Sequence, residues 1–200
     1  SLGGLLAFAI LGVIFYGIWR GSRRPAGRSA GRGAFWLRSG FFYLLASALF
    51  FYLAWLGWRP IPLEISPQAR ALMLAVGSLF YFPGMGLVLW GRLELGRNYF
   101  VSTALGAQLF ADQKLVTTGP YALMRHPMYA GLILAGSGAP LIYTTWTTAY
   151  FAVIAPFLAL RMRREEQALA AEFGPQWQDY CRRVPALFPR LRKPAGSGSH

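Results

Sequence analysis

The sequence predicts an all-α integral membrane protein with about five transmembrane helices, and two observations carry this prediction. Of the 200 residues, 55% are hydrophobic and only 14% are charged, whereas soluble domains average about a quarter charged residues. The apolar residues gather in long runs, which indicates that lipid surrounds much of the chain. The second observation is the net charge of +13, because its distribution along the chain indicates an orientation in a membrane.

Three long apolar runs occupy the first part of the chain. Residues 2–19 contain no charge and would reach roughly 27 Å as a helix, which is enough for the hydrocarbon core of a bilayer. Residues 41–58 form a second run rich in Phe, Leu and Tyr, and residues 69–90 form a third. Transmembrane helices tolerate proline and glycine as kinks or as points of close packing. The third run contains three such residues: Pro83, Gly84 and Gly86.

Two shorter apolar segments follow, at residues 128–143 and 147–160. Only residues 144–146 separate them, so we expect a tight antiparallel hairpin of helices. Each segment is short for a full span and would need tilt or local thinning of the bilayer. The alternative, a buried hairpin of a soluble protein, fits poorly with three long apolar runs in the same chain.

The basic residues predict the orientation. Eighteen of the 20 Lys and Arg residues fall in residues 20–38, in residues 91–125 or in the tail from Arg161. These regions alternate with the loop at residues 59–70, which holds the other two, and with the turn at residues 144–146, which holds none. Because cytoplasmic loops carry an excess of Lys and Arg, we expect the N-terminus outside and the C-terminus in the cytoplasm. The membrane would be a bacterial inner membrane, its anionic lipids would be partners, and no nucleic acid is needed to explain the charge.

The sequence makes a metal site improbable. Its single cysteine, Cys181, excludes an intrachain disulfide and a cysteine-based zinc cluster. Residues 196–200 resemble a cloning linker followed by the start of a tag, which leaves His126 as the single native imidazole. We therefore expect neither a metal nor metal chemistry.

A polar connection at residues 92–125 is far longer than a simple loop. Gly119 and Pro120 predict a turn that opens one short helical turn. His126 precedes Pro127, which favours an extended backbone at His126 and a helix that begins at the proline. Such a helix N-terminus attracts carboxylates or phosphates. An Arg125–His126 pair that only contacts lipid phosphates is an equally open interpretation.

The tail predicts a helical hairpin beyond the membrane. The fifth helix would continue through Arg161, Glu165 and Glu166 until Gly174-Pro175 ends it. A short helix would follow, suited to lying on the membrane or to covering a site, with four residues on one face: Trp177, Tyr180, Cys181 and Val184. Arg161 and Glu166 stand about 140° apart on an ideal helix, and exposed i, i+4 ion pairs are an alternative of little energetic value. Spacing alone therefore does not establish a site.

Two separated patterns carry a family resemblance. The first is TGPY…RHPMYAG at residues 118–131, and the second runs from Arg161 through Glu165-Glu166 and Phe173-Gly174 to RVP at residues 183–185. Together they resemble the conserved core of isoprenylcysteine carboxyl methyltransferases, and membrane phospholipid N-methyltransferases share much of the same pattern. The order of the two patterns, each beside a predicted membrane boundary, makes the resemblance more specific than either pattern alone.

The resemblance implies a pocket for S-adenosylmethionine on the cytoplasmic side and a lipidic or small hydrophobic acceptor that arrives from the bilayer. The apolar runs predict three N-terminal transmembrane helices within residues 1–90, and the resemblance implies that residues 91–195 form the catalytic region. Seven residues would bind the cofactor: Leu115, Val116, Gly119, His126, Tyr129, Glu165 and Tyr180. Three would act at the acceptor end: Arg125, Arg161 and Glu166. The sequence has no glycine-rich dinucleotide motif, so the soluble methyltransferase design is not expected.

The expected chemistry leaves the acceptor open. Methyl transfer from a sulfonium needs alignment and desolvation more than acid catalysis. A carboxylate acceptor, as in a prenyl-cysteine-like compound, could be held by two arginines with Glu166 orienting one of them. A lipid amine could instead give its proton to Glu166, and a thiol is a third possibility. The competing interpretations are a non-catalytic lipid-binding scaffold and a membrane reductase of similar helical architecture that uses a nicotinamide cofactor.

Overall fold

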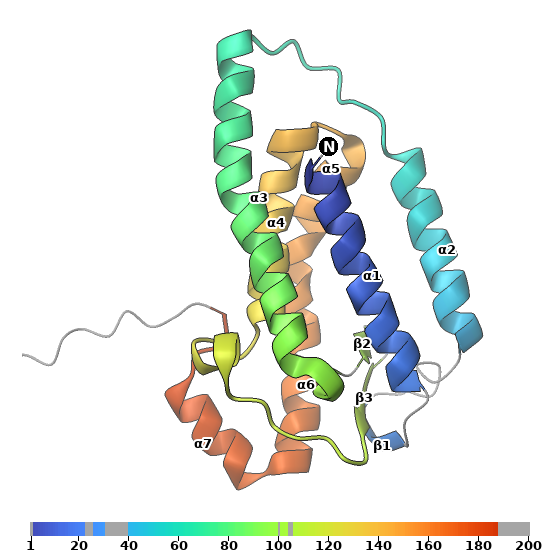
Figure 1. Cartoon of the computed structure of the whole chain (residues 1–200), viewed down its shortest axis with the longest axis vertical. Helices are drawn as coiled ribbons and strands as arrows, with labels where there is room; N and C mark the ends of the chain where they lie inside the picture. The colour runs from blue at the N-terminus through green and yellow to red at the C-terminus, as the bar shows by residue number, and fades with distance from the viewer. Residues whose placement is uncertain (1, 23–25, 31–39, 100, 104–105, 188–200) are drawn as a thin grey trace, which may run out of the picture.

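The computed structural model describes residues 2–22, 26–30, 40–99, 101–103 and 106–187. Helices dominate this part of the chain (Figure 1), and seven of them are α-helices: α1 (Leu2–Ser22), α2 (Gly40–Leu56), α3 (Pro67–Leu95), α4 (Pro127–Tyr143), α5 (Trp146–Ile154), α6 (Leu158–Phe173) and α7 (Pro175–Arg183). Three short 3-10 turns join them: η2 (Gly96–Asn98), η3 (Gly119–Ala122) and η4 (Ala155–Phe157).

Each apolar run identified in the sequence is helical. The fifth run is divided, because α5 ends at Ile154 and the turn η4 around Pro156 precedes α6. By length and apolar composition, one of the described helices, Pro67–Asn98, is sufficient to cross a membrane. Three apolar helical stretches are shorter: Leu2–Ile14, Leu45–Leu56 and Trp146–Phe157.

Helices α3 and α4 lie side by side at the centre of the bundle, and glycines form their contact (Figure 1). A Cβ atom added at Gly84 would lie 2.7 Å from the carbonyl oxygen of Gly131, and one at Gly138 would lie 2.5 Å from the carbonyl oxygen of Gly77. The glycines of each helix are seven residues apart, a spacing that keeps them on one face. The packing role expected for Gly84 is confirmed, whereas Gly86 faces open space.

The predicted hairpin after α4 is confirmed. Thr144 adopts a left-handed conformation with φ of 47° and ends α4. The Thr145 side chain then caps α5 by accepting a hydrogen bond from the N–H of Thr148, in a capping box. The loop after α2 closes over this turn, since the N–H of Ile61 donates to the carbonyl of Thr144 at 2.8 Å.

The described helices agree with the all-α expectation, and the structure adds a small antiparallel sheet that was not predicted. Its strands are β1 (Ala26–Ala30), β2 (Val101–Thr103) and β3 (Gly106–Phe110), in the order β1-β3-β2. Strand β1 lies in the predicted basic loop, which is rich in Gly and Arg and has no alternating pattern. Its partner β3 is about eighty residues away in sequence, so no local signal predicts the pairing. Residues 31–39 of that loop and the linker at 196–200 lie outside the described residues.

The sheet joins the loop after α1 to the connection after α3, so both lie at the same end of the bundle, together with α7 (Figure 1). The turn between α4 and α5 lies at the opposite end. The predicted helix stop is confirmed, because α6 ends at Phe173, Gly174 has φ of 48° and Pro175 opens α7. Trp177 and Tyr180 of α7 are buried against the connection between α3 and α4.

Candidate functional site

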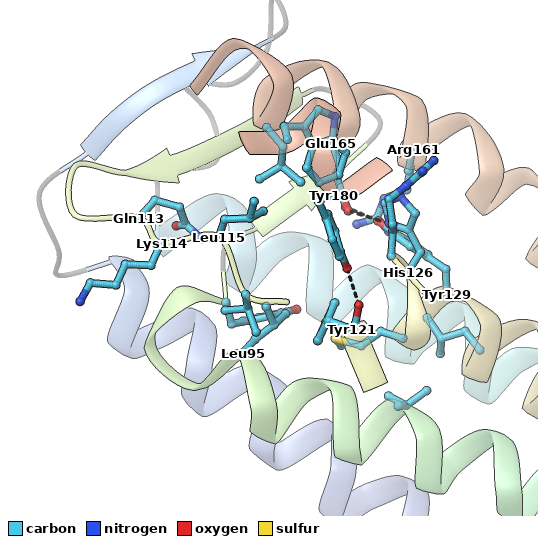
Figure 2. A pocket seen from close by; sticks show the side chains of 18 of the residues that line it. Leu95, Gln113, Lys114, Leu115, Tyr121, His126, Tyr129, Arg161, Glu165 and Tyr180 are labelled. Carbon is cyan, nitrogen blue, oxygen red and sulfur yellow. Dashed lines mark hydrogen bonds and ion pairs between the residues drawn. The ribbon is translucent and has the colours of Figure 1, made fainter. Parts of the chain in front are cut away.

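A cavity of about 270 Å³ lies at the end of the bundle that carries the sheet and α7. Its polar wall comes from the connection before α4, from the start of α4, and from α6 and α7. Its apolar wall comes from the helical bundle, including Ile14 of α1, Val88 of α3 and Leu132 of α4. Figure 2 shows polar side chains from all of these polar segments converging on one space.

Eight of the ten residues singled out in the sequence line this cavity. Six belong to the predicted cofactor set: Leu115, Val116, His126, Tyr129, Glu165 and Tyr180. Two belong to the predicted acceptor end: Arg125 and Arg161. The remaining two, Gly119 and Glu166, are not part of the lining, although each supports residues near it.

His126 lies where the sequence predicts it, at the N-cap of α4 with Pro127 as the first helical residue. Its side chain is buried, with 5% of the residue surface exposed. The backbone N–H of His126 donates to the carbonyl of Ala186 at 2.9 Å, and that of Arg125 donates to Pro185 at 2.8 Å. These two N–H groups are therefore used to hold the chain after α7 against the cavity, and they are not free to bind an anion.

Arg125 connects the two sequence patterns. Its Nε and Nη2 lie 3.0 and 2.8 Å from the same carboxylate oxygen of Glu166, while its Nη1 donates to the carbonyls of Cys181 and Val184. Charge-assisted hydrogen bonds of this kind fix a guanidinium more firmly than neutral ones. Arg125 thus ties α6 and the end of α7 to the start of α4.

Glu166 supports the cavity from behind its wall. Its Oε1 atom accepts a hydrogen bond from His126 Nε2 at 3.0 Å in addition to the bonds from Arg125. The hydrogen bond from His126 lowers the pKa of Glu166 below its ordinary value; partial burial opposes this shift, and the charges of His126 and Arg125 add to it. The ionised carboxylate is therefore stabilised, and Glu166 is a weak base in this position.

Glu165 points into the cavity from the same helix turn. Its Oε1 accepts a hydrogen bond from the Tyr129 hydroxyl, and its Oε2 lies 3.9 Å from His126 Nδ1 (Figure 2). The Arg161 guanidinium lies 5.7 Å from the centre of the Tyr129 ring, close enough for a cation–π interaction. Adjacent glutamates on α6 thus have different surroundings, because one faces the cavity and the other faces Arg125.

Tyr180 fixes the position of α7 over the cavity. Its hydroxyl donates to the backbone carbonyl of Tyr121 at 2.7 Å (Figure 2). Burial raises the pKa of Tyr180 above its ordinary value, so this hydroxyl stays protonated. Trp177 packs beside it, and both residues separate the cavity from solvent on this side.

Gly119 is needed for the turn, not for the cavity lining. It adopts φ of 56°, which favours glycine, and a Cβ atom here would lie 2.7 Å from the Glu94 carboxylate. Thr118 donates to the same carboxylate at 2.5 Å. The turn η3 is therefore held against the end of α3.

Sequence reasoning gave too little weight to the segment after α3. Tyr99 lines the cavity, and so do Gln113 and Lys114. Asn98 holds the latter two in place, because its backbone carbonyl accepts from Gln113 Nε2 at 2.7 Å and its side chain accepts from the Lys114 N–H at 3.0 Å. For Asn98 and Tyr99 the sequence left open both a place at the acceptor entrance and a core or loop role, and the lining of the cavity includes Tyr99.

Among the described residues, no group of three or more His, Cys, Asp or Glu side chains could hold a metal ion. Cys181 is a partly buried free thiol. Burial raises its pKa above the ordinary value, which keeps the thiol protonated.

Comparison with known proteins gives a consistent family. Residues 72–176 match the family described as "Phospholipid methyltransferase". Methanethiol S-methyltransferase 2 of Bradyrhizobium diazoefficiens is 35% identical over 74% of this chain and 59% of that protein. The cobalt-zinc-cadmium resistance protein CzcN of Cupriavidus metallidurans is 37% identical over 74% of this chain and 60% of that protein.

A plant relative matches a shorter segment. Protein-S-isoprenylcysteine O-methyltransferase B of Arabidopsis thaliana is 38% identical over 38% of this chain and 40% of that protein. The chain spans about three-fifths of the length of the bacterial relatives named above.

Proposed function

The chain belongs to the phospholipid methyltransferase family, and on this premise we propose that it transfers a methyl group from S-adenosylmethionine to a lipidic or small hydrophobic acceptor. One observation carries the proposal. The two sequence patterns, about forty residues apart, meet in a single cavity through Arg125, His126 and Tyr129 on one side and Arg161 and Glu165 on the other.

The lining of the cavity suits S-adenosylmethionine. Its volume of about 270 Å³ is near the lower end of small-molecule sites, at roughly 300 Å³. The Glu165 carboxylate and the face of Tyr129 are groups that attract a cation such as a sulfonium or an ammonium. Leu115 and Val116 would hold the cofactor through their backbone groups, with His126 and Tyr180 alongside. When bound, the cofactor supplies an activated methyl group on a positively charged sulfur.

The residues of the chain would then align the acceptor and exclude water. Arg161 and Arg125 would orient the acceptor, and Glu166 would keep Arg125 in position through the bonds described above. Tyr180 and Trp177 would keep solvent out from the α7 side. Alignment and desolvation are the main requirements for an in-line displacement at a methyl carbon.

We further propose that the helices lie in a membrane, with the cavity at its cytoplasmic face. Large apolar side chains on the outer surface support this, among them Leu79 and Trp55 at 71% exposure each and Val153 at 67%. In this arrangement α1 to α4 would provide four spans, and α5 with η4 and the start of α6 would provide the fifth. The N-terminus would lie outside and the C-terminus in the cytoplasm of a bacterium. Residues 91–195 would carry the reaction and residues 1–90 would complete the bundle.

The test is transfer of a radiolabelled methyl group from S-adenosylmethionine into a bacterial lipid extract and into small alkyl thiols. The purified protein in detergent should label a product that mass spectrometry identifies, and Arg161→Ala should not. An inactive wild-type protein that is folded and supplied with both the lipid extract and the thiols would refute the proposal.

A further inference from the structure

Arg92 is a buried arginine that the site described above does not use. It lies near the end of α3 with only 6% of its surface exposed. Its guanidinium lies 4.3 Å from the centre of the Tyr99 ring, and Nη1 donates to the carbonyl of Gly96 at 3.3 Å. Its Nε has no hydrogen-bond partner among the described residues, and no carboxylate there lies within ion-pair distance. A buried guanidinium without a counter-charge is costly and calls for an explanation.

Helix α1 makes room for this guanidinium. A methyl group added at Gly17 would overlap the terminal nitrogen Nη2 of Arg92. Gly17 is itself buried, so the space is closed on both sides, by α1 and by the Tyr99 ring. The N-terminal helix, which lies outside the residues that match the family, thus holds Arg92 in one position.

Tyr99 separates Arg92 from the cavity. The Tyr99 side chain lines the cavity, and it lies close enough to Arg161 and Glu165 to interact with both electrostatically. Arg92 therefore lies against the ring of a residue that lines the cavity near Arg161.

The charges around this space favour an anion. Two basic side chains, Arg125 and Arg161, and one acidic side chain, Glu165, line this space. The side chain of Lys114 is exposed and extends away from it (Figure 2). Arg92 adds a further positive charge behind Tyr99. The other nearby carboxylate, Glu166, bonds Arg125 and His126 and does not line the cavity, so it is poorly placed to take a proton from an ammonium group.

We infer that Arg92, held by Gly17 and stacked against Tyr99, is a positioning residue that makes the cavity selective for an anionic methyl acceptor, a thiolate or a carboxylate. This inference rests on the proposed methyl transfer. The lone pair of the acceptor forms the new bond to the methyl carbon, the bond from that carbon to the donor sulfur breaks, and its electron pair stays on that sulfur. An anionic acceptor and a cationic donor thus give two neutral products, and no protein group has to accept a proton.

The test compares three acceptors with the same hydrocarbon chain: octanethiol, octanoate and octylamine. Each is assayed with S-adenosylmethionine and the purified protein in detergent, at a pH where part of the amine is neutral. We expect kcat/KM for the thiol or the carboxylate to exceed that for the amine by about tenfold or more. A charge a few ångströms from the acceptor in a partly buried site produces an effect of this size. Comparison of octanethiol with octanoate shows whether the protein prefers a thiolate or a carboxylate as its anionic acceptor.

Variants then assign the selectivity to Arg92. Arg92→Met should lower kcat/KM for the anionic acceptor by about tenfold, mainly through KM, and should leave the value for octylamine and the affinity for S-adenosylhomocysteine nearly unchanged. Arg92→Lys should restore part of the loss, since it keeps the charge without the planar stacking surface. Gly17→Ala displaces the guanidinium without removing it. It should lower the ratio of kcat/KM for the anionic acceptor to kcat/KM for octylamine. Arg70→Met, at the opposite end of the bundle, is the matched control and should leave the ratio at its wild-type value.

The outcomes separate this inference from the proposed function. A preference for octylamine, or an equal loss for all three acceptors in Arg92→Met, overturns the inference while methyl transfer stands. Absence of both S-adenosylhomocysteine binding and methyl transfer in the folded wild-type protein overturns the proposed function and this inference with it.

Discussion

The two ends of the helical bundle each contain an arginine that donates to carbonyls at the C-terminal end of a helix, yet only one end has the chemistry of a site. Arg70 donates to the carbonyls of Leu141 and Ile142 in α4, at 3.1 and 2.6 Å. Arg125 donates in the same way to the end of α7, but it also pairs with Glu166 and faces the cavity. Cations near a helix C-terminus are stabilising in themselves, so an anchored arginine alone does not indicate function.

The difference lies in what surrounds each arginine. At the Arg70 end, backbone hydrogen bonds and the Thr145 capping box satisfy the turn, and that arginine has no ion pair in the described part of the chain. At the Arg125 end, charged and aromatic side chains from four segments meet around an open volume. A candidate site is therefore recognised by convergence of side chains on a cavity.

The largest expected effect is at the cavity. Arg161→Ala should reduce methyl transfer by about 100-fold or more, because loss of an orienting group misplaces the reacting atoms. Binding of S-adenosylhomocysteine should be largely retained. Single-turnover transfer and calorimetry on the same preparation measure the two quantities, and near-wild-type transfer would show that Arg161 does not act at the acceptor end.

A substitution at the Arg70 end of the bundle should change the stability of the protein and leave its activity unchanged. Arg70→Met removes two charge-assisted hydrogen bonds from the end of α4 and should lower the free energy of unfolding by about 1–3 kcal/mol. Activity per folded molecule should stay at the wild-type level. Thermal unfolding in detergent followed by tryptophan fluorescence, together with the transfer assay, checks both statements. A specific loss of kcat in a stable Arg70→Met protein would remove the distinction between the two ends.

The smallest effect concerns acid stability. Since the pKa of Glu166 is lowered in the folded protein, its contribution to stability is fully present above the ordinary value of 4.5 and is lost as the pH falls through the lowered pKa. Solvent reaches Glu166 and limits the size of the effect. The midpoint of thermal unfolding should fall toward acid pH more steeply in the wild type than in Glu166→Gln. Identical pH profiles would contradict the assigned interaction.

Local sequence signals predicted much of the fold. The stop at Gly174-Pro175, the helix that begins at Pro127 and the turn after Tyr143 all depend on residues adjacent in the chain, and all are confirmed. The pairing of β1 with β3 depends on distant residues in strands without an alternating pattern, which explains why it was missed.

The site was predictable to a similar degree. Eight of the residues selected from the sequence line the cavity, and six of them belong to the two family-like patterns. Motif positions keep their place relative to a helix boundary, which explains why they meet there. The sequence could not separate Glu165 from Glu166, since only the packing of α6 determines which of two adjacent carboxylates faces the cavity. Nor could it indicate that Arg92 is buried, because a single arginine at the end of an apolar helix usually extends to the membrane surface.

The most direct test of the central claim is calorimetric titration of the purified protein with S-adenosylhomocysteine. The account predicts saturable binding of one molecule per chain by the wild type and nearly unchanged binding by Arg161→Ala and by the control Arg70→Met. It predicts clearly weaker binding by Glu165→Gln, because we propose that this lining residue contacts the cofactor. Absence of binding by folded wild-type protein, or equal affinity in Glu165→Gln, would contradict the assignment of this cavity.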